Sequence, residues 1–175
     1  GRDGFAISET PGGITITASK PQGALYGAYR LLRNVNAGYP AASGRSVPAY
    51  GLRILNHWDN LDGTVERGYA GKSLWRWEEL PATLSPRYEE YARACASVGI
   101  NAAVLNNVNA SSRILSAEYL QKVAALADVM RPYGITVYLS VNFASPVQLD
   151  SLPTADPLDP AVARWWKRKA DEIYR

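Results

Sequence analysis

The feature that most constrains the fold is an apolar segment followed by a helical one, an order that occurs three times after residue 48. The apolar segments are residues 52–56 (LRILN), 101–105 (NAAVL) and 135–141 (ITVYLSV). The third is apolar and β-branched, as expected of a parallel strand covered on both faces. Strands that alternate with helices are typical of a parallel α/β fold. We therefore predict three adjacent parallel strands joined by right-handed crossovers.

The ends of the helices are marked by capping residues. Pro86 stands at the first helical position of one helix, Gly99 ends it, Ser116 caps a second and Pro132 helps to end that one. Asp159 opens a third helix, which we expect to continue to the last residue. The side chains predicted to face inward are Tyr88, Tyr91, Ala92, Cys95 and Val98 on the first helix, and Leu120, Val123, Ala127 and Met130 on the second.

The first part of the chain has a different pattern. Residues 5–8 and 14–18 alternate around a Thr-Pro-Gly-Gly turn, which predicts a β-hairpin. Residues 22–36 follow as a helix, and we predict that Leu25, Ala28, Tyr29 and Leu32 form its buried face. Residues 38–49 are rich in Gly, Ser, Pro and Ala and read as a linker, so we predict a domain boundary near Pro48, between residues 1–48 and 49–175.

Polar and aromatic residues follow each predicted strand. No glycine-rich phosphate turn follows the first one, which disfavours a dinucleotide-binding fold. Asn, His, Trp and Asp side chains at the carboxyl ends of successive strands are instead what a (β/α)8 TIM barrel places in its active site. Such a barrel needs about 250 residues. We therefore predict the α/β class, with only the first three βα units of a TIM barrel present.

Composition excludes several classes of function. The formal charge is +3 and the cations are scattered apart from residues 164–169 (RWWKRK), so we expect no nucleic-acid partner. No apolar run approaches the roughly 20 residues that cross a membrane, and no signal peptide is visible. These observations favour a soluble protein, cytoplasmic or periplasmic, over a membrane-bound one, and they leave the compartment open. Cys95 is the single cysteine, and we interpret it as core packing. The chain has 5 Trp and 11 Tyr, which suit polar ligands with flat faces, such as sugars.

One long motif carries a family resemblance. Residues 53–75 (RILNHWDNLDGTVERGYAGKSLW) closely resemble the first strand and loop of the catalytic barrel in glycoside hydrolase family 67, the xylan-processing α-glucuronidases. The similarity continues through residues 99–110, 134–146 and 154–166. Residues 22–33 look like the helix that ends the small α/β domain ahead of the barrel, so residues 1–48 would be the C-terminal part of that domain. The chain departs from the family at Asp150-Ser151, where a pair of glycines is expected.

The resemblance implies an enzyme that releases α-1,2-linked 4-O-methyl-glucuronic acid from xylo-oligosaccharides by inversion, without metal or cofactor. Its partners would be aldouronic acids derived from glucuronoxylan. Inversion needs a general acid and a general base about 6.5–9.5 Å apart. The family carries its acid in a Lys-Ala-Asp-Ser-Glu segment after the fourth strand, so both groups are expected beyond residue 175. We therefore expect this stretch alone to be inactive. A homodimer formed through other parts is left open.

Five residues are candidates for substrate binding. Trp58 matches the tryptophan that packs on the glucuronic acid ring in the family; the alternative is a plug in the barrel mouth. Val108 matches a position that lines the pocket for the 4-O-methyl group. The amides of Asn107 and Asn142 can donate and accept, as vicinal hydroxyls require, or they cap the strand ends. His57 is interpreted as a buried hydrogen-bonding residue beneath the site, with direct substrate contact as the alternative.

Three acidic residues of the same loop are weaker candidates. Asp59, Asp62 and Glu66 could converge as a catalytic pair, but Arg67 and Lys72 offer salt-bridge partners for Glu66 and Asp62, so we favour a loop-ordering role. His57 has no neighbours at the spacing of a catalytic triad or a metal site. Two rival functions remain: a carbohydrate-binding protein without catalysis, and another barrel glycosidase that acts on a different sugar.

Overall fold

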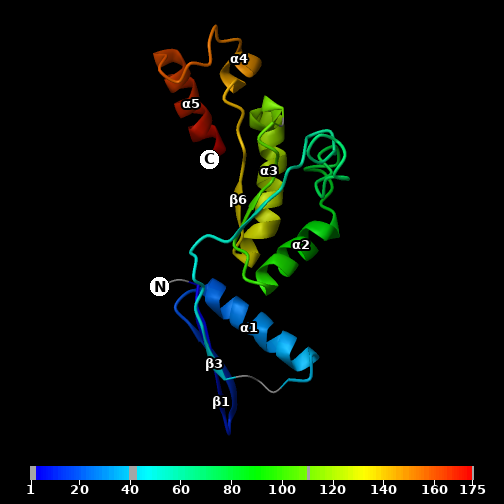
Figure 1. Ribbon diagram of the computed structural model, residues 1–175, viewed down its shortest axis with the longest axis vertical. Helices are drawn as coiled ribbons and strands as arrows, with labels where there is room; N and C mark the ends of the chain where they lie inside the picture. Colours follow the sequence, from blue (N-terminus) through cyan, green and yellow to red (C-terminus); the bar gives the residue numbers. More distant parts are fainter. Residues whose placement is uncertain (1–2, 40–42, 110, 175) are drawn as a thin grey trace. The chain divides into compact units, whose positions relative to one another are not determined.

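A computed structural model describes residues 3–39, 43–109 and 111–174 (Figure 1). The chain divides into two compact units. The first comprises Gly1–Leu55, Pro86–Ala103 and Val129–Thr136, and the second comprises Asn56–Ser85, Val104–Asp128 and Val137–Arg175. Within the described ranges, no helix is long and apolar enough to cross a membrane.

The first unit contains an antiparallel sheet in the order β2-β1-β3. β1 (Phe5–Thr10) and β2 (Gly13–Ala18) form the predicted hairpin, and Thr10 pairs with Gly13 across the turn. β3 (Gly44–Ser46) pairs with the other edge of β1 and was not predicted. The prediction of a linker at residues 38–49 is therefore wrong for this strand, and residues 40–42 lie outside the described residues. β3 forms because β1 has a free edge to pair with, and local alternation of apolar and polar residues does not predict it.

Helix α1 (Pro21–Asn36) covers this sheet through its glycines (Figure 1). A Cβ atom at Gly23 would lie 2.4 Å from the carbonyl oxygen of Gly4, and one at Gly27 would lie 2.6 Å from Ile16 Cγ2. The helix is therefore close enough to the strands that only glycine fits. The predicted face was wrong: the buried residues are Gly23, Tyr26 and Gly27, whereas Leu32 is 57% exposed.

Strands β4 (Ile54–Asn56), β5 (Ala102–Val104) and β6 (Thr136–Tyr138) form a second sheet in the order β4-β5-β6. Hydrogen bonds at both ends advance in the same direction along each pair of strands, so the sheet is parallel. They are Asn101 N to Arg53 O, His57 N to Val104 O, Thr136 N to Asn101 O and Leu105 N to Tyr138 O. The prediction of three adjacent parallel strands is confirmed. In the described residues the sheet is open, and the barrel stays a prediction.

β6 is shorter than predicted because a side chain replaces its neighbouring strand. Asn106 accepts a hydrogen bond from Ser140 N at 3.0 Å and donates one to Ser140 O at 2.9 Å. The backbone hydrogen bonds between β5 and β6 therefore end before Ser140, whose backbone groups bond to the Asn106 side chain instead. Thr136 and Tyr138 are exposed, so the expectation of a strand covered on both faces is wrong for the described residues, in which β6 is an edge strand.

Helices α2 (Pro86–Ser97) and α5 (Pro160–Ile173) begin as predicted. The buried residues of α2 include Tyr88, Ala92 and Cys95 from the predicted stripe, together with Ala96, and Tyr91 is half-buried. Val98 is 67% exposed because it lies beyond the last residue of the helix. The Asp159 side chain caps α5 by accepting from Ala161 N at 2.7 Å, and Trp165 is the buried tryptophan of the basic segment. Arg175, to which the helix was expected to continue, lies outside the described residues.

Helix α3 (Ala117–Met130) buries a face one residue away from the predicted stripe. The buried residues are Tyr119, Lys122, Leu126 and Met130, whereas Leu120, Val123 and Ala127 are half-buried. Lys122 can lie at a buried position because its ammonium pairs with Glu118 at 2.9 Å and lies over the Tyr119 ring. The predicted cap is confirmed, since Ser116 Oγ accepts from Tyr119 N. Three shorter helices complete the fold: η1 (Ser112–Leu115), η2 (Arg131–Tyr133) and α4 (Ser145–Asp150).

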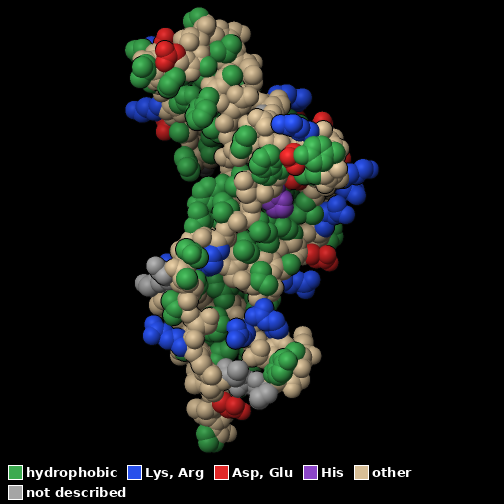
Figure 2. Space-filling model, viewed as in Figure 1, with side chains coloured by type: hydrophobic (Ala, Val, Ile, Leu, Met, Phe, Trp, Pro, Cys, Tyr) green, Lys and Arg blue, Asp and Glu red, His purple; other side chains and the backbone are tan. Residues whose placement is uncertain are grey.

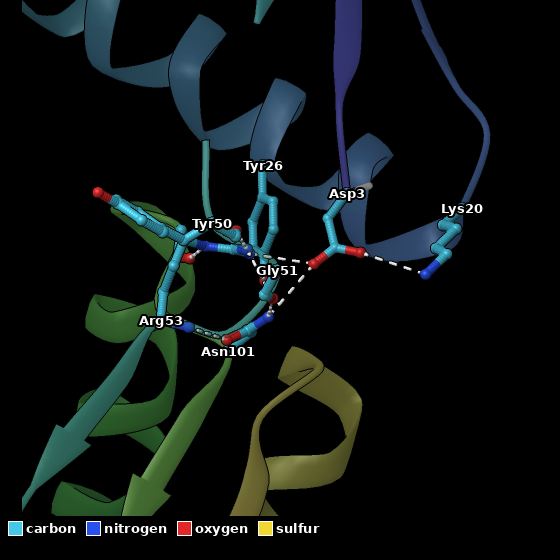
Figure 3. A network of polar contacts seen from close by, with 8 residues as sticks. Asp3, Lys20, Tyr26, Tyr50, Gly51, Arg53 and Asn101 are labelled. Atoms are coloured by element: carbon cyan, nitrogen blue, oxygen red, sulfur yellow. Dashed lines mark hydrogen bonds and ion pairs between the residues drawn. The ribbon is translucent and has the colours of Figure 1, made fainter. Parts of the chain in front are cut away.

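Arg53 organises the polar contacts of the first unit (Figure 3). Its guanidinium donates to Asp3 at 3.0 Å, to the carbonyl of Gly99, and to the carbonyls of Tyr50 and Gly51. Burial raises the pKa of Asp3. Hydrogen bonds from Arg53 and Asn101, together with the nearby positive charges, lower the pKa by more than burial raises it, so the net shift is downward. Asp3 is therefore held ionised beside a cation that has little exposure to solvent.

Candidate functional site

The second unit contains the carboxyl ends of β4, β5 and β6 and the segments that follow them. Trp58 follows β4, Asn107 and Val108 follow β5, and Asn142 follows β6. Because the strands are parallel and adjacent, these residues lie beyond the same edge of the sheet. The backbone nitrogen of Asn107 donates to the carbonyl oxygen of Asp59 at 2.8 Å, which joins the segment after β5 to the residue next to Trp58.

Asp59 holds the loop after β4 in shape. It is 4% exposed, and its Oδ2 accepts hydrogen bonds from Ser73 Oγ at 2.5 Å and from Leu74 N at 3.2 Å. Its backbone also forms a bridge to Val65. The carboxylate thus connects the beginning of the loop to its end.

The backbone of Trp58 is fixed while its side chain stays open. Its carbonyl oxygen accepts from Glu66 N at 2.7 Å, and the carbonyl of Glu66 accepts from Asn60 Nδ2 at 2.7 Å. Glu66 has a φ of 57°, a left-handed conformation that is strained for a residue with a side chain. The indole is 43% exposed. A large flat side chain on a fixed backbone is suited to contact a ligand with a flat apolar face.

His57 lies at the base of this loop. Its Nδ1 is 3.8 Å from Asp59 Oδ1, and its ring meets the Trp75 ring edge-on at 5.3 Å. The chain has one histidine, and its side chain reaches the surface in Figure 2. Burial lowers the pKa of His57, and the charge of Asp59 only partly opposes this. The imidazole is therefore neutral near pH 7.

Among the described residues, neither Asp62 nor Glu66 forms the salt bridge predicted for it. Asp62 Oδ1 instead accepts from Thr64 N at 2.9 Å and from Thr64 Oγ1 at 2.6 Å, and these bonds lower the pKa of Asp62. Glu66 hydrogen-bonds to Tyr69, which raises the pKa of the Tyr69 hydroxyl. The prediction of Arg67 and Lys72 as partners is wrong because a turn and a phenol satisfy these carboxylates. Asp59 and Asp62 both accept hydrogen bonds from within the loop, as a loop-ordering role requires.

The two asparagine side chains cap their own segments. Asn107 Oδ1 accepts from Asn109 N at 3.0 Å, and Asn142 Oδ1 accepts from Ala144 N at 2.9 Å. Both oxygens are therefore used locally, whereas neither amide nitrogen donates to another described residue. Val108 is 51% exposed beside Asn107.

Sequence reasoning missed two residues of this edge. Asn106 is 1% exposed and connects the segment after β5 to Ser140, through the bonds that end β6. Its place in a run of asparagines was visible, but a partner 34 residues away was not. Phe143, next to Asn142, is exposed, and its ring meets Trp166 edge-on.

Comparison with known proteins places the chain in a family. The model of the glycosyl hydrolase family 67 middle domain matches residues 34–175. The chain belongs to glycoside hydrolase family 67. It is 42% identical over 175 residues to the "Probable alpha-glucuronidase A" of Aspergillus clavatus, covering 99% of this chain and 21% of that protein. It is also 42% identical over 178 residues to the alpha-glucuronidase A of Emericella nidulans, covering 98% and 21%. The chain thus spans about a fifth of the length of these curated relatives.

Asp150 and Ser151 stand where the family resemblance predicts a pair of glycines, and the structure shows what each does there. Ser151 follows α4 with a φ of 54°, a conformation that glycine adopts without strain. Asp150 accepts a hydrogen bond from Trp165 Nε1 and so connects the end of α4 to α5. A contact that glycine cannot make therefore accompanies the strained turn.

In this family 67 chain, hydrogen bonds also connect the segment that follows β5 to the segment that follows β6. Ser145 donates to Ser112 at 2.9 Å, and Ser112 donates to Gln148 at 2.6 Å. These bonds connect η1 to α4. In the ranges that the structure describes, no three His, Cys, Asp or Glu side chains are grouped to hold a metal ion.

Proposed function

We propose that the chain supplies one wall of the substrate pocket of an inverting α-glucuronidase. The enzyme would release 4-O-methyl-glucuronic acid from oligosaccharides derived from glucuronoxylan. The observation that carries the proposal is Trp58, a half-exposed indole on a backbone held by hydrogen bonds at the end of a parallel strand. Membership of family 67 and the names of the relatives support the choice of substrate.

The other residues have complementary roles in this proposal. Val108 offers an apolar contact for the 4-O-methyl group, since it is half-exposed at the end of the next strand. The amide nitrogens of Asn107 and Asn142 donate to sugar hydroxyls, because their oxygens are already bound by the backbone. His57 stays neutral and supports the loop beneath Trp58.

The general acid and base are proposed to come from residues beyond 175. Asp59 and Asp62 accept hydrogen bonds that fix the loop, and Glu66 binds Tyr69, so all three acids already have local partners. The proposed architecture is a TIM barrel whose first three βα units lie in residues 49–175, preceded by the end of a small α/β domain in residues 1–48. One carboxyl group would protonate the leaving oxygen while the other activates water on the opposite face.

Hydrolysis of aldouronic acids tests the proposal. The complete α-glucuronidase that contains these residues is expected to release 4-O-methyl-glucuronate, and the 175-residue chain is expected to release none. Release by the purified chain in proportion to its concentration would assign catalysis to Asp59, Asp62 or Glu66. A complete enzyme that hydrolyses another glycoside but not aldouronic acids would contradict the substrate assignment.

A further inference from the structure

A basic pocket of about 250 Å³ lies within the first unit. Its volume is slightly below the usual range of drug-sized sites, about 300–1,000 Å³, and so suits a small ligand. Arg30 and Arg33 line it from α1, and Arg53 lines it from the segment before β4. Asp3 is the one acidic residue among its described lining. The excess of cations over anions in the lining favours a negatively charged ligand.

Two of the three arginines already have partners. Arg53 donates to Asp3 at 3.0 Å, and Lys20 lies 3.7 Å from the other oxygen of the same carboxylate (Figure 3). Arg33 donates to the carbonyl oxygen of Ser97 at 3.3 Å. Because the charge of Asp3 is balanced by Arg53 and Lys20, the pocket keeps its positive excess.

Arg30 and Tyr26 offer hydrogen-bond donors that have no acceptor. The Arg30 side chain is exposed, and its guanidinium makes no hydrogen bond or ion pair with another described residue. Tyr26 is 6% exposed, and its hydroxyl accepts from Arg53 at 3.5 Å, but its own proton has no acceptor among the described residues. Burial raises the pKa of Tyr26, so the hydroxyl keeps this proton. A buried donor without an acceptor is unfavourable, and a ligand that supplies the acceptor removes this cost.

The rest of the lining favours an organic anion over an inorganic one. Phe5, Pro48 and Val98 add apolar surface to the pocket. Ser46 adds a hydroxyl that has no partner among the described residues. Phosphate and sulfate have no apolar part to bury against such surface, whereas a carboxylate on a carbon skeleton has one.

We propose that this pocket of the first unit binds a small organic carboxylate. Arg30 donates to the carboxylate, since a guanidinium can bind both carboxylate oxygens at once. The Tyr26 hydroxyl supplies a further donor, and the apolar residues contact the carbon skeleton of the ligand. The site does not rest on the proposed function, because Trp58 and the other residues of that site belong to the second unit.

Titration of the 175-residue chain with D-glucuronate, followed by NMR, tests this site. The amide signals of Arg30 and Gly99, which both line the pocket, are expected to shift until the site is saturated. D-Glucose differs from this probe only at the carboxylate, and it is expected to cause no such shifts. Trp58→Ala is expected to leave these shifts unchanged, which separates the site from the proposed sugar pocket of the second unit.

Two variants identify the groups that hold the carboxylate. Arg30→Gln is expected to weaken binding about tenfold or more, the effect of one lost hydrogen bond to a charged group. Tyr26→Phe keeps the ring and is expected to weaken binding about threefold, the effect of one neutral hydrogen bond. Arg93→Gln removes the same charge from an exposed position of α2 outside the pocket and is the control. The melting temperature of Arg30→Gln should match that of the unmodified chain.

Four results would overturn the assignment of this pocket. The first is the absence of shifts at Arg30 and Gly99, and the second is an equal loss of affinity in Arg30→Gln and Arg93→Gln. The third is binding of inorganic phosphate as tight as that of D-glucuronate, which would show attraction of any anion. The fourth is binding by the 175-residue chain that a full-length family 67 protein with these residues lacks, which would show that another segment fills the pocket.

Discussion

Each unit contains a carboxylate that orders its surroundings, and the two do so in different ways: Asp3 is half-buried and Asp59 is buried. Asp3 in the first unit pairs with the Arg53 guanidinium at 3.0 Å and with Lys20 at 3.7 Å. Asp59 in the second unit accepts from a hydroxyl and a backbone nitrogen, and its ionisable neighbour is a histidine that burial keeps neutral. The charged network serves the packing of strands and a helix. The network around Asp59 orders a loop in which the Trp58 indole stays half-exposed.

Arg53→Ala should break the first network with the largest effect on stability. Removal of the guanidinium leaves the half-buried Asp3 carboxylate without its main partner, and it removes donors from three carbonyl groups. We expect the free energy of unfolding to fall by about 3 kcal/mol, measured by urea denaturation of the 175-residue chain. Lys72→Ala, at an exposed position of the loop after β4, is the control. A loss under about 1 kcal/mol would mean that the network is no stronger than a surface ion pair.

Asp59→Ala should break the second network with a smaller effect. Ser73 Oγ and Leu74 N lose their shared acceptor, for which we expect a cost of about 2 kcal/mol. Hydrogen exchange should become faster at the Leu74 amide and unchanged at the amide of Asn101, in the first unit. Asp59→Asn keeps one acceptor oxygen and should lose less. Unchanged exchange at Leu74 would show that Asp59 does not hold the loop.

Acid should weaken the two regions in separate pH ranges. The pKa of His57 in the folded chain is lowered from 6.5. As the pH falls below 6.5, the unfolded chain therefore takes up a proton before the folded chain does, and the folded state loses stability. The pKa of Asp3 is lowered from 3.8, so its contribution is present above that value and is lost as the pH falls below it. His57→Gln should remove the first step of a pH–stability curve and Asp3→Asn the second. A curve that either variant leaves unchanged would contradict the assignment.

Ser151→Gly should have the smallest effect, and it should stabilise. The change relieves a left-handed backbone conformation at a cost of greater freedom in the unfolded chain, for a net gain of about 0.5 kcal/mol. Glu66→Gly should give a similar gain from the backbone, reduced by the loss of the Glu66 contact to Tyr69. Thermal unfolding measures both. Destabilisation by Ser151→Gly would show that its hydroxyl matters more than its backbone.

The sequence predicted the elements whose causes are local. Alternation located the hairpin and the three parallel strands, and Ser116 and Asp159 identified helix starts. Features set by distant partners could not be predicted. β3 depends on the free edge of β1, and the end of β6 depends on the Asn106 side chain.

Side-chain burial and loop contacts were harder still to predict from the sequence. The buried face of α1 is formed by glycines around Tyr26, whereas a hydrophobic stripe points to leucines. The partners of Asp62 and Glu66 are a threonine and a tyrosine, and charge alone pointed to cations. Trp58 and Val108 were proposed as sugar contacts from family resemblance alone, because a single aromatic or aliphatic residue carries no signal for a sugar by itself.

The most direct test of the account measures Trp58→Ala in a full-length family 67 protein that carries these residues, assayed for the proposed α-glucuronidase activity. If the indole packs on the sugar ring as proposed, its loss removes that contact and loosens the position of the scissile bond, so kcat/KM on aldouronic acids should fall a hundredfold or more, about 1.4 kcal/mol for each tenfold. Trp58→Phe should retain part of the activity, and the melting temperature of both should change little, since the indole is 43% exposed. A lower melting temperature with unchanged kcat/KM would contradict the account and make Trp58 a packing residue of the loop.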